Sequence, residues 1–358
     1  MAKRLLVLVA TGKGAFILES NQGRQDWTVH GPLCDAQPTN HLVADPETGT
    51  IWAGGGDAWR GAAVWRSTDQ GATFEKFTDG LAYPEAHDKI KAVWSLAYAH
   101  GRLLAGAEPA GLFESRDDGE TWQHVQGLTD HPSRPDWVLG GGGLILHHIV
   151  PHPEDPDRIW TAISVAGVFH TADGGQSWTP RNQGTRCDFF GTGPTYPEHG
   201  QCVHSLAMAR TRPDRLYQQN HCGMYRTDNG GQSWTSIENG LPSDFGFASA
   251  THPTDPDTAW LLPLVGAEHR YAPEGRLAVW RTQDAGQSWT DLRQGLPQEN
   301  AYVCILRQAM ATDPLTPTGI YFGTTGGTLY ASPDEGQSWT PIAQNLPAIR
   351  AVETVVTE

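Results

Sequence analysis

The sequence predicts an all-β fold, a single seven-bladed β-propeller that spans residues 1–358. One octapeptide recurs along the whole chain, and its copies, including a degraded one, end 47 to 56 residues apart. That spacing is typical of repeat architectures in which each unit is one small sheet. The composition agrees, because 41 Gly, 25 Pro and 14 Trp without any polar tract indicate many short strands and turns.

The repeated octapeptide has the form Ser/Thr-x-Asp-x-Gly-x-Ser/Thr-Trp/Phe. A degraded seventh copy ends at Trp27, and Asn229 replaces the aspartate in one clear copy. A second aromatic residue precedes the last position of each clear copy by nine residues. The clear copies are residues 67–74, 115–122, 171–178, 227–234, 282–289 and 332–339.

This octapeptide resembles the Asp box, or BNR repeat, of sialidase-like β-propellers. In such a turn the hydroxyl and the carboxylate bind backbone N–H groups, and the glycine supplies a positive φ. The final aromatic side chain packs between neighbouring sheets. We therefore expect the boxes to close hairpins rather than to bind a ligand.

Each repeat divides into four short strands. In the third clear repeat we expect them at 146–151, 158–164, 167–171 and 177–181, and in the fourth at 203–209, 215–220, 223–227 and 233–237. Residues 4–30 supply only three strands, and 348–356 supply one more alternating strand. Pairing that C-terminal strand with the N-terminal three would close the ring and bury two exposed sheet edges.

Charge and composition exclude several function classes. The net charge is −15 and all five Lys lie within the first 91 residues, which disfavours nucleic acid and anionic lipid as partners. No apolar stretch has the length of a membrane span. Five scattered cysteines and the lack of a convincing signal peptide indicate a cytoplasmic protein, and we expect a monomer.

The links between blades carry the unusual residues. The long links are 54–61, 81–90, 127–144, 184–201 and 265–276, and all are expected on the face opposite the octapeptides. A mouth of this kind is a usual ligand site. Arg186 and Arg270 could instead pair with acidic neighbours and only tie down loops. The candidate substrate-binding residues are Trp59, Arg60, Arg186, Phe189, Phe190, Arg270 and Tyr271.

Three carboxylates on the same predicted face are candidate catalysts: Glu108, Asp188 and Glu268. A pair at suitable separation could hydrolyse a glycosidic bond. The alternative is that each is a solvated loop residue.

Several histidines also converge on this mouth. Aligning the units places His147 on His204, each at the start of an innermost strand, and antiparallel pairing brings His221 beside His204. With His199 they form a candidate site for a transition metal such as zinc, iron or copper. The alternatives are metal-free acid–base or binding roles, or a structural role. The same pairing places Cys202 opposite Cys222. The two cysteines could be reduced thiols, a cross-strand disulfide or further metal ligands.

The resemblance implies a range of activities, because Asp-box propellers include sialidases, xyloglucan-type endoglucanases, sortilin-like receptors and photosystem assembly factors. We do not expect sialidase activity, because the chain has seven units and no Arg-Ile-Pro motif. Two hypotheses remain. The first is a hydrolase-like enzyme that acts on a small molecule or sugar at the channel mouth, with or without a metal bound by histidine. The second is a non-catalytic binding or assembly scaffold.

Overall fold

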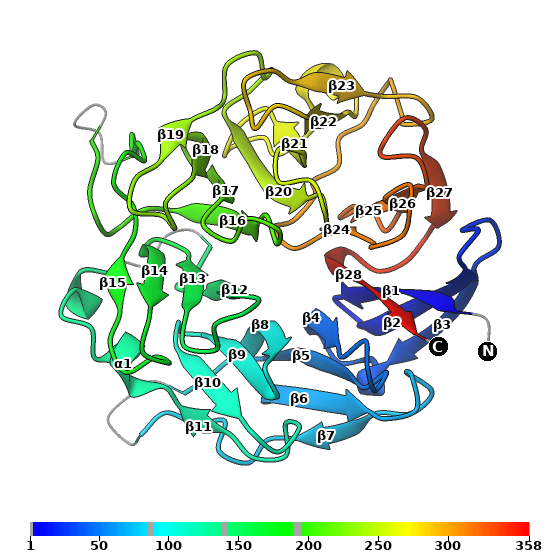
Figure 1. Cartoon of the computed structure of the whole chain (residues 1–358). Coiled ribbons are helices and arrows are strands. Elements are labelled where there is room, and N and C mark those ends of the chain that lie inside the picture. Colours follow the sequence, from blue (N-terminus) through cyan, green and yellow to red (C-terminus); the bar gives the residue numbers. More distant parts are fainter. Residues whose placement is uncertain (1–2, 85–88, 138–141, 190–194, 358) are drawn as a thin grey trace.

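Seven four-stranded antiparallel sheets surround a central axis in the computed structural model (Figure 1). The structure describes residues 3–84, 89–137, 142–189 and 195–357. The predicted seven-bladed β-propeller is therefore confirmed. Helix is confined in these residues to α1 (Gln126–Thr129) and to 3-10 turns at Cys34–Ala36, Arg134–Asp136 and Pro273–Gly275. No helix in the described part of the chain has the length and hydropathy needed to cross a membrane.

Six blades follow the chain in order, each with its innermost strand first. They are β4 (Thr39–Ala44), β5 (Ile51–Asp57), β6 (Gly61–Ser67) and β7 (Glu75–Phe77); β8 (Ala92–Ala99), β9 (Arg102–Glu108), β10 (Leu112–Ser115) and β11 (Gln123–His124); β12 (Leu146–Pro151), β13 (Ile159–Ile163), β14 (Gly167–Thr171) and β15 (Thr179–Pro180); β16 (Val203–Met208), β17 (Leu216–Asn220), β18 (Gly223–Thr227) and β19 (Thr235–Ser236); β20 (Phe245–Thr251), β21 (Ala259–Leu264), β22 (Val279–Thr282) and β23 (Thr290–Leu292); β24 (Met310–Thr312), β25 (Ile320–Gly323), β26 (Leu329–Ser332) and β27 (Thr340–Ala343).

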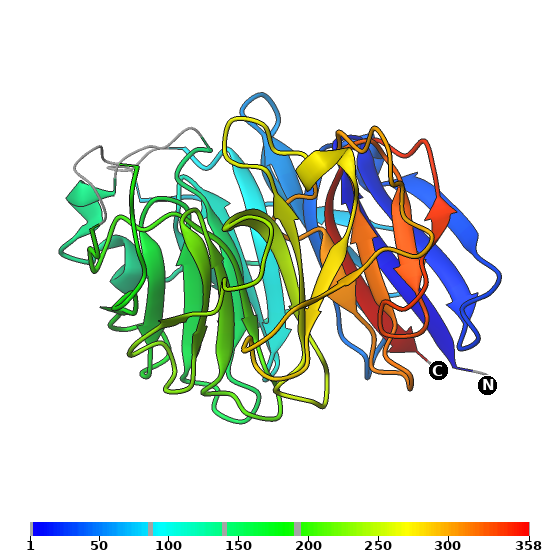
Figure 2. The same ribbon diagram turned by 90° about the horizontal axis from the view of Figure 1, so that it is seen from above.

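The remaining blade joins both ends of the chain. It consists of β28 (Ile349–Thr357), β1 (Arg4–Thr11), β2 (Gly14–Asn21) and β3 (Thr28–Leu33), with β28 innermost. Leu6 pairs with Val355 and Val9 with Val352, and all four side chains are buried. The expected closure by the C-terminal strand is thus confirmed. Both termini consequently lie close together on one side of the ring (Figure 2).

The octapeptide forms the turn between the third and fourth strands of a blade. In the third clear copy the Asp173 carboxylate accepts hydrogen bonds from Thr171 Oγ1 (2.7 Å) and from the backbone N–H of Ser177 (3.0 Å). The N–H of Gly175, whose φ is +98°, donates to Thr171 Oγ1 (2.9 Å). Trp178 then buries its ring in a core cluster shared with the preceding blade.

The fourth strands are shorter than the sequence pattern indicates. The strand expected at 177–181 is β15, which contains only Thr179–Pro180, and that expected at 233–237 is β19, which contains only Thr235–Ser236. The turn itself causes the difference. Its carboxylate or amide oxygen holds the N–H of Ser177 or Ser233, so sheet pairing begins only after the tryptophan.

A β-bulge near the start of the innermost strand connects neighbouring blades. The pairing register shifts at Asn40, His147 and His204. Each of these side chains reaches a carbonyl oxygen of the next blade: Asn40 Nδ2 donates to Val93 O (2.9 Å), His147 Nε2 lies 3.0 Å from Val203 O, and His204 Nδ1 lies 2.6 Å from Gly246 O. The bulge re-aims the side chain, as bulges at sheet ends often do.

Candidate functional site

Three potential metal ligands meet where two strands of one blade end. Cys202 precedes β16, His204 lies near the start of β16, and His221 lies in the turn between β17 and β18. The backbone N–H of His221 donates to Cys202 O (2.9 Å), which fixes the turn against the first strand. Their ligand atoms all lie within 4.8 Å of one another. These residues are called the Cys–His–His group below.

The hydrogen bonds of His204 fix its tautomer. A backbone carbonyl only accepts, so Nδ1 carries the proton that is donated to Gly246 O at 2.6 Å. Nε2 therefore presents a lone pair, and it lies 3.6 Å from Cys202 Sγ. Burial, and then the charge of Arg307, lower the pKa of His204 well below its usual value. A neutral imidazole held by a carbonyl on its other nitrogen is the form that binds a metal.

Aromatic rings enclose His221 and His204. The ring of His221 contacts Phe189 at 5.1 Å and Phe245 at 5.3 Å between centroids, both in edge-on geometry. The ring of His204 lies 4.5 Å from that of the buried Phe247. Burial, followed by the charge of Arg270, lowers the pKa of His221 as well. Both imidazoles are therefore neutral at pH 7 and available as ligands.

Two arginines face the same aromatic side chain. The guanidinium carbons of Arg307 and Arg270 lie 5.1 and 5.6 Å from the centre of the Phe247 ring. Arg307 precedes β24, and Arg270 lies in the link between β21 and β22. Figure 2 shows that link (yellow) and the β5–β6 link (blue) standing on the side of the ring opposite the termini.

The structure does not bring His147 or His199 into the group. Both ring nitrogens of His147 are engaged, because Nδ1 lies 2.7 Å from His148 Nδ1 and Nε2 lies 3.0 Å from Val203 O. The aligned register was right, but the bulge turns this ring into the joint between two blades. His199 instead lies 3.3 Å from Asp136 at the rim. Of the four predicted histidines, the structure therefore places only His204 and His221 in the group, together with Cys202.

None of the three candidate carboxylates belongs to the Cys–His–His group, and two of them have other partners. Glu108 accepts a hydrogen bond from Trp94 Nε1 (2.8 Å) and lies 3.4 Å from Lys91 Nζ. Asp188 lies 2.9 Å from Arg186 Nε. Glu268 is exposed in the β21–β22 link. No described contact pairs any two of them.

Two of the candidate substrate-binding arginines pair with carboxylates of this chain. Arg186 contacts Asp188, Asp244 and Glu238, which is the loop-tying arrangement left open by the sequence. Arg60 pairs with Asp57 (2.7 Å), and Trp59 beside it is 92% exposed.

Two further candidates, Phe189 and Tyr271, make aromatic contacts. Phe189 reaches the Cys–His–His group through His221. Tyr271 packs edge-on against Tyr302. Phe190 lies outside the described residues.

The cysteines at the mouth are free thiols. Cys202 and Cys222 form no disulfide, and the Cys222 sulfur accepts a hydrogen bond from the backbone N–H of Asp188 (3.4 Å). Burial is the main cause that raises the pKa of both thiols. The cross-strand disulfide considered from the sequence is absent from the structure.

Comparison with known proteins agrees with this architecture. Residues 157–357, more than half of the chain, match the family model described as the DUF6242 beta propeller domain. The chain belongs to this family. The DUF6242 propeller is also 23% identical over 263 residues to an oligoxyloglucan-reducing end-specific xyloglucanase of Emericella nidulans, an alignment that covers 65% of this chain and 31% of that protein.

Two further similarities are to part of a receptor and to a solved structure. The human VPS10 domain-containing receptor SorCS3 is 31% identical over 91 residues, which is 22% of this chain and 7% of the receptor. The solved GH74 xyloglucanase of Xanthomonas campestris superposes with a TM-score of 0.65 at 19% identity, covering 97% of this chain and 53% of the enzyme. This DUF6242 propeller thus spans about a third or less of these curated relatives, and the structural likeness shows the fold.

Sequence reasoning missed two residues of this propeller's mouth. Phe247 is the residue of β20 that contacts His204, and its place in the repeat, near the start of an innermost strand, was readable from the unit alignment. Arg307 lies in an ordinary link before β24, and no motif marks it.

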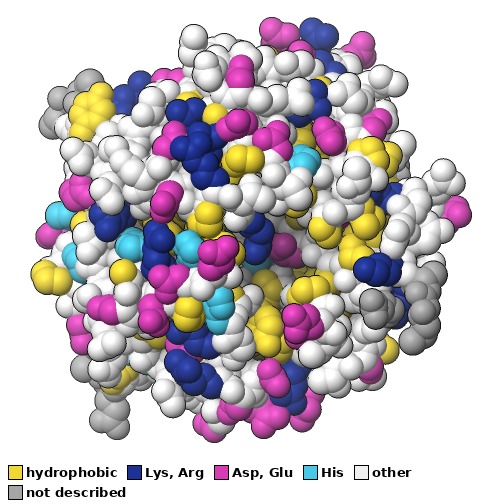
Figure 3. Space-filling model, viewed as in Figure 1, with side chains coloured by type: hydrophobic (Ala, Val, Ile, Leu, Met, Phe, Trp, Pro, Cys, Tyr) yellow, Lys and Arg dark blue, Asp and Glu magenta, His cyan; other side chains and the backbone are white. Residues whose placement is uncertain are grey.

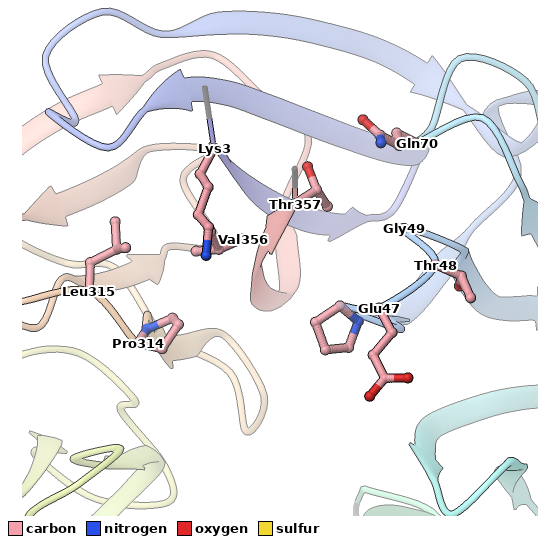
Figure 4. Close-up of a pocket in the computed structure, with 10 residues that line it drawn as sticks. Lys3, Glu47, Thr48, Gly49, Gln70, Pro314, Leu315, Val356 and Thr357 are labelled. Atoms are coloured by element: carbon pink, nitrogen blue, oxygen red, sulfur yellow. The ribbon is translucent and has the colours of Figure 1, made fainter. Parts of the chain in front are cut away.

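A separate cavity of about 620 Å³ lies on the side where the termini meet. Figure 3 shows the ring hollowed at its centre. Figure 4 shows Lys3 beside Val356 at the cavity, with Leu315 across from them. Its wall also includes Glu47 and Gln70. This cavity contains none of the candidate site residues.

Proposed function

We propose that this chain acts on a carbohydrate, or a related small molecule, at the mouth of its channel, with a transition metal held by Cys202, His204 and His221. The observation that carries the proposal is the Cys–His–His group, whose ligand atoms lie within 4.8 Å of one another. The carbohydrate part is supported by the xyloglucanases among the similar proteins. The octapeptides, in this proposal, are Asp boxes of the BNR type.

The donor set fits a borderline or soft metal. Thiolate and neutral imidazole suit zinc, copper or iron, whereas calcium and magnesium prefer oxygen ligands. Three protein ligands leave a position open for water or substrate, the usual arrangement in catalytic zinc sites. Such an ion supplies Lewis acidity or an activated water.

The surrounding residues prepare this site without the ion. Gly246 O orients His204 so that Nε2 points toward Cys202. Phe245 and Phe247 are buried against His204, and the exposed Phe189 offers an aromatic side chain to a sugar. The carboxylates proposed from the sequence are held by other side chains or exposed, so metal assistance explains catalysis better than a carboxylate pair.

Metal analysis tests this proposal. Protein purified without an affinity tag should contain about one equivalent of transition metal, and Co²⁺ titrated into the metal-free protein should give a thiolate charge-transfer band. Cys202→Ser should abolish the band and Cys222→Ser should retain it, because Cys222 lies outside the group. Equal metal content in both variants would refute the metal site. So would a wild type that contains no metal as purified and binds no Co²⁺ in the titration.

A turnover assay separates catalysis from binding alone. Wild type and His204→Gln are compared on a panel of neutral and acidic oligosaccharides. Cleavage that disappears with the metal supports an enzyme. Stoichiometric metal and saturable sugar binding without cleavage would instead support the non-catalytic binding scaffold.

A further inference from the structure

The mouth contains two positive charges without acidic partners. Arg307 and Arg270 make no ion pair with any described residue, and the only hydrogen bond between these guanidinium groups and the described chain is from Arg270 Nε to Ala267 O (2.8 Å). Arg186, on the same face, shows the contrast, because three carboxylates surround it. An arginine side chain that is buried away from bulk water usually forms an ion pair with an acidic side chain.

Arg307 is the more constrained of the two. Its Nε atom is buried without a hydrogen-bond partner among the described residues, while the side chain as a whole remains partly accessible. Burial lowers the pKa of Arg307 from its usual value. A buried guanidinium nitrogen without a hydrogen-bond partner costs folding free energy, so its position calls for an explanation.

The acidic groups that act on Arg307 are thiols. Cys202 and Cys304 are the groups whose negative charge would favour the guanidinium, and burial raises the pKa of both. Neither thiol offers the paired oxygens that match the planar fork of an arginine. Carboxylate and phosphate groups offer them.

We propose that Arg307 and Arg270 form an oxyanion subsite that binds the carboxylate or phosphate group of the molecule acted on at the Cys–His–His group. The proposal rests on the function proposed above and names its substrate class: a sugar, or similar small molecule, that carries an anionic group. Phe247 links the two parts, since its ring contacts both guanidinium groups and His204. One short ligand can therefore reach both.

The overall charge makes this site distinctive. The chain carries a net charge of −15, so its average field repels anions. Two guanidinium groups without carboxylate partners among the described residues would select an anion by direct contact rather than by long-range attraction.

Calorimetric titration with D-glucuronate, inorganic phosphate and D-glucose tests the subsite. The wild type should bind at least one anionic probe about ten- to a hundredfold more tightly than glucose, the range for hydrogen bonds between charged groups. Preference for glucuronate assigns the subsite to carboxylates, and preference for phosphate assigns it to phosphate esters. Equal binding of all three probes would overturn the proposal.

Variants locate the effect. Arg307→Gln should remove the preference for anions, and Arg307→Lys should restore part of it. Arg270→Gln, at an exposed position, should weaken it without risk to the fold. Arg158→Gln is the control, because it removes the same charge from an arginine that pairs with Asp214 and stacks on Trp160. Unchanged anion binding in both Arg307→Gln and Arg270→Gln would refute the subsite.

Metal content of the same variants keeps the two proposals apart. Arg307→Gln should retain the wild-type amount of metal while losing the anion preference. If Cys202→Ser loses the metal but still binds anions, the oxyanion subsite exists independently of the metal. A wild type that binds metal but shows no anion preference would refute only the subsite.

Discussion

Replacing Trp178 by alanine should cost about 3–5 kcal/mol of unfolding free energy, the range for truncating a buried aromatic side chain. Its ring is 6% exposed and packs in a core cluster with residues of the preceding blade, including Leu112 and Leu104. A tryptophan buries roughly 150–250 Å², which at about 25 cal/mol per Å² gives about 4–6 kcal/mol. The variant also loses the indole hydrogen bond to Gly175 O (3.1 Å).

The assay is equilibrium urea unfolding, followed by circular dichroism. Trp59→Ala is the matched control, because this tryptophan is 92% exposed and its loss should change stability by less than about 0.5 kcal/mol. Binding at the mouth should survive in folded Trp178→Ala protein, since the octapeptide turn lies at the other end of the blade. Equal destabilisation by the two substitutions would refute the claim that this aromatic residue joins neighbouring blades.

Three further predictions address other parts of the ring. Deleting residues 348–358 should leave β1 with an open edge and cause aggregation, seen by light scattering; a soluble, fully folded truncation would contradict the closure. His147→Ala should lower the melting temperature but not the metal content, because His147 Nε2 holds Val203 O; loss of metal from this variant would return it to the ligand set. Hydrogen bonds from Thr73 to Asp69 and from Ser177 to Asp173 lower the pKa of these carboxylates to about 2, below an unfolded value of about 3.9. Their stabilisation is therefore present above pH 4 and lost as the pH falls toward 2, so the melting temperature should drop over that window and less steeply in Asp173→Asn.

The architecture was predictable because the repeat marks one position in every blade. Each octapeptide satisfies its own backbone locally, as the contacts of Thr171, Asp173 and Gly175 show, so tertiary context hardly alters it. The closing strand was predictable for a related reason. Residues 4–30 lack one strand, and an alternating segment at 348–356 supplies it.

The site was predictable only in part. Alignment placed His147 and His204 at equivalent backbone positions, and both do lie at a bulge in an innermost strand. What alignment could not supply is the local direction of each ring, which depends on neighbours such as His148 for one and Cys202 for the other. Arg307 was missed because what distinguishes it is the lack of an acidic partner. Whether a residue distant in sequence pairs with an arginine cannot be read from the spacing of motifs.

The joining of β28 to β1 also bears on how the chain is made. In sequence β1 precedes all the other strands of the ring and β28 follows them, so one edge of β1 stays unpaired until the strands of the other six blades have been made. Closing so long a loop carries a large entropic penalty, and contacts between residues this distant in sequence slow folding. Blades made of consecutive strands can form as soon as their own strands are available, whereas ring closure must wait for β28. The interval between them is when a nascent chain of this protein has most need of a chaperone.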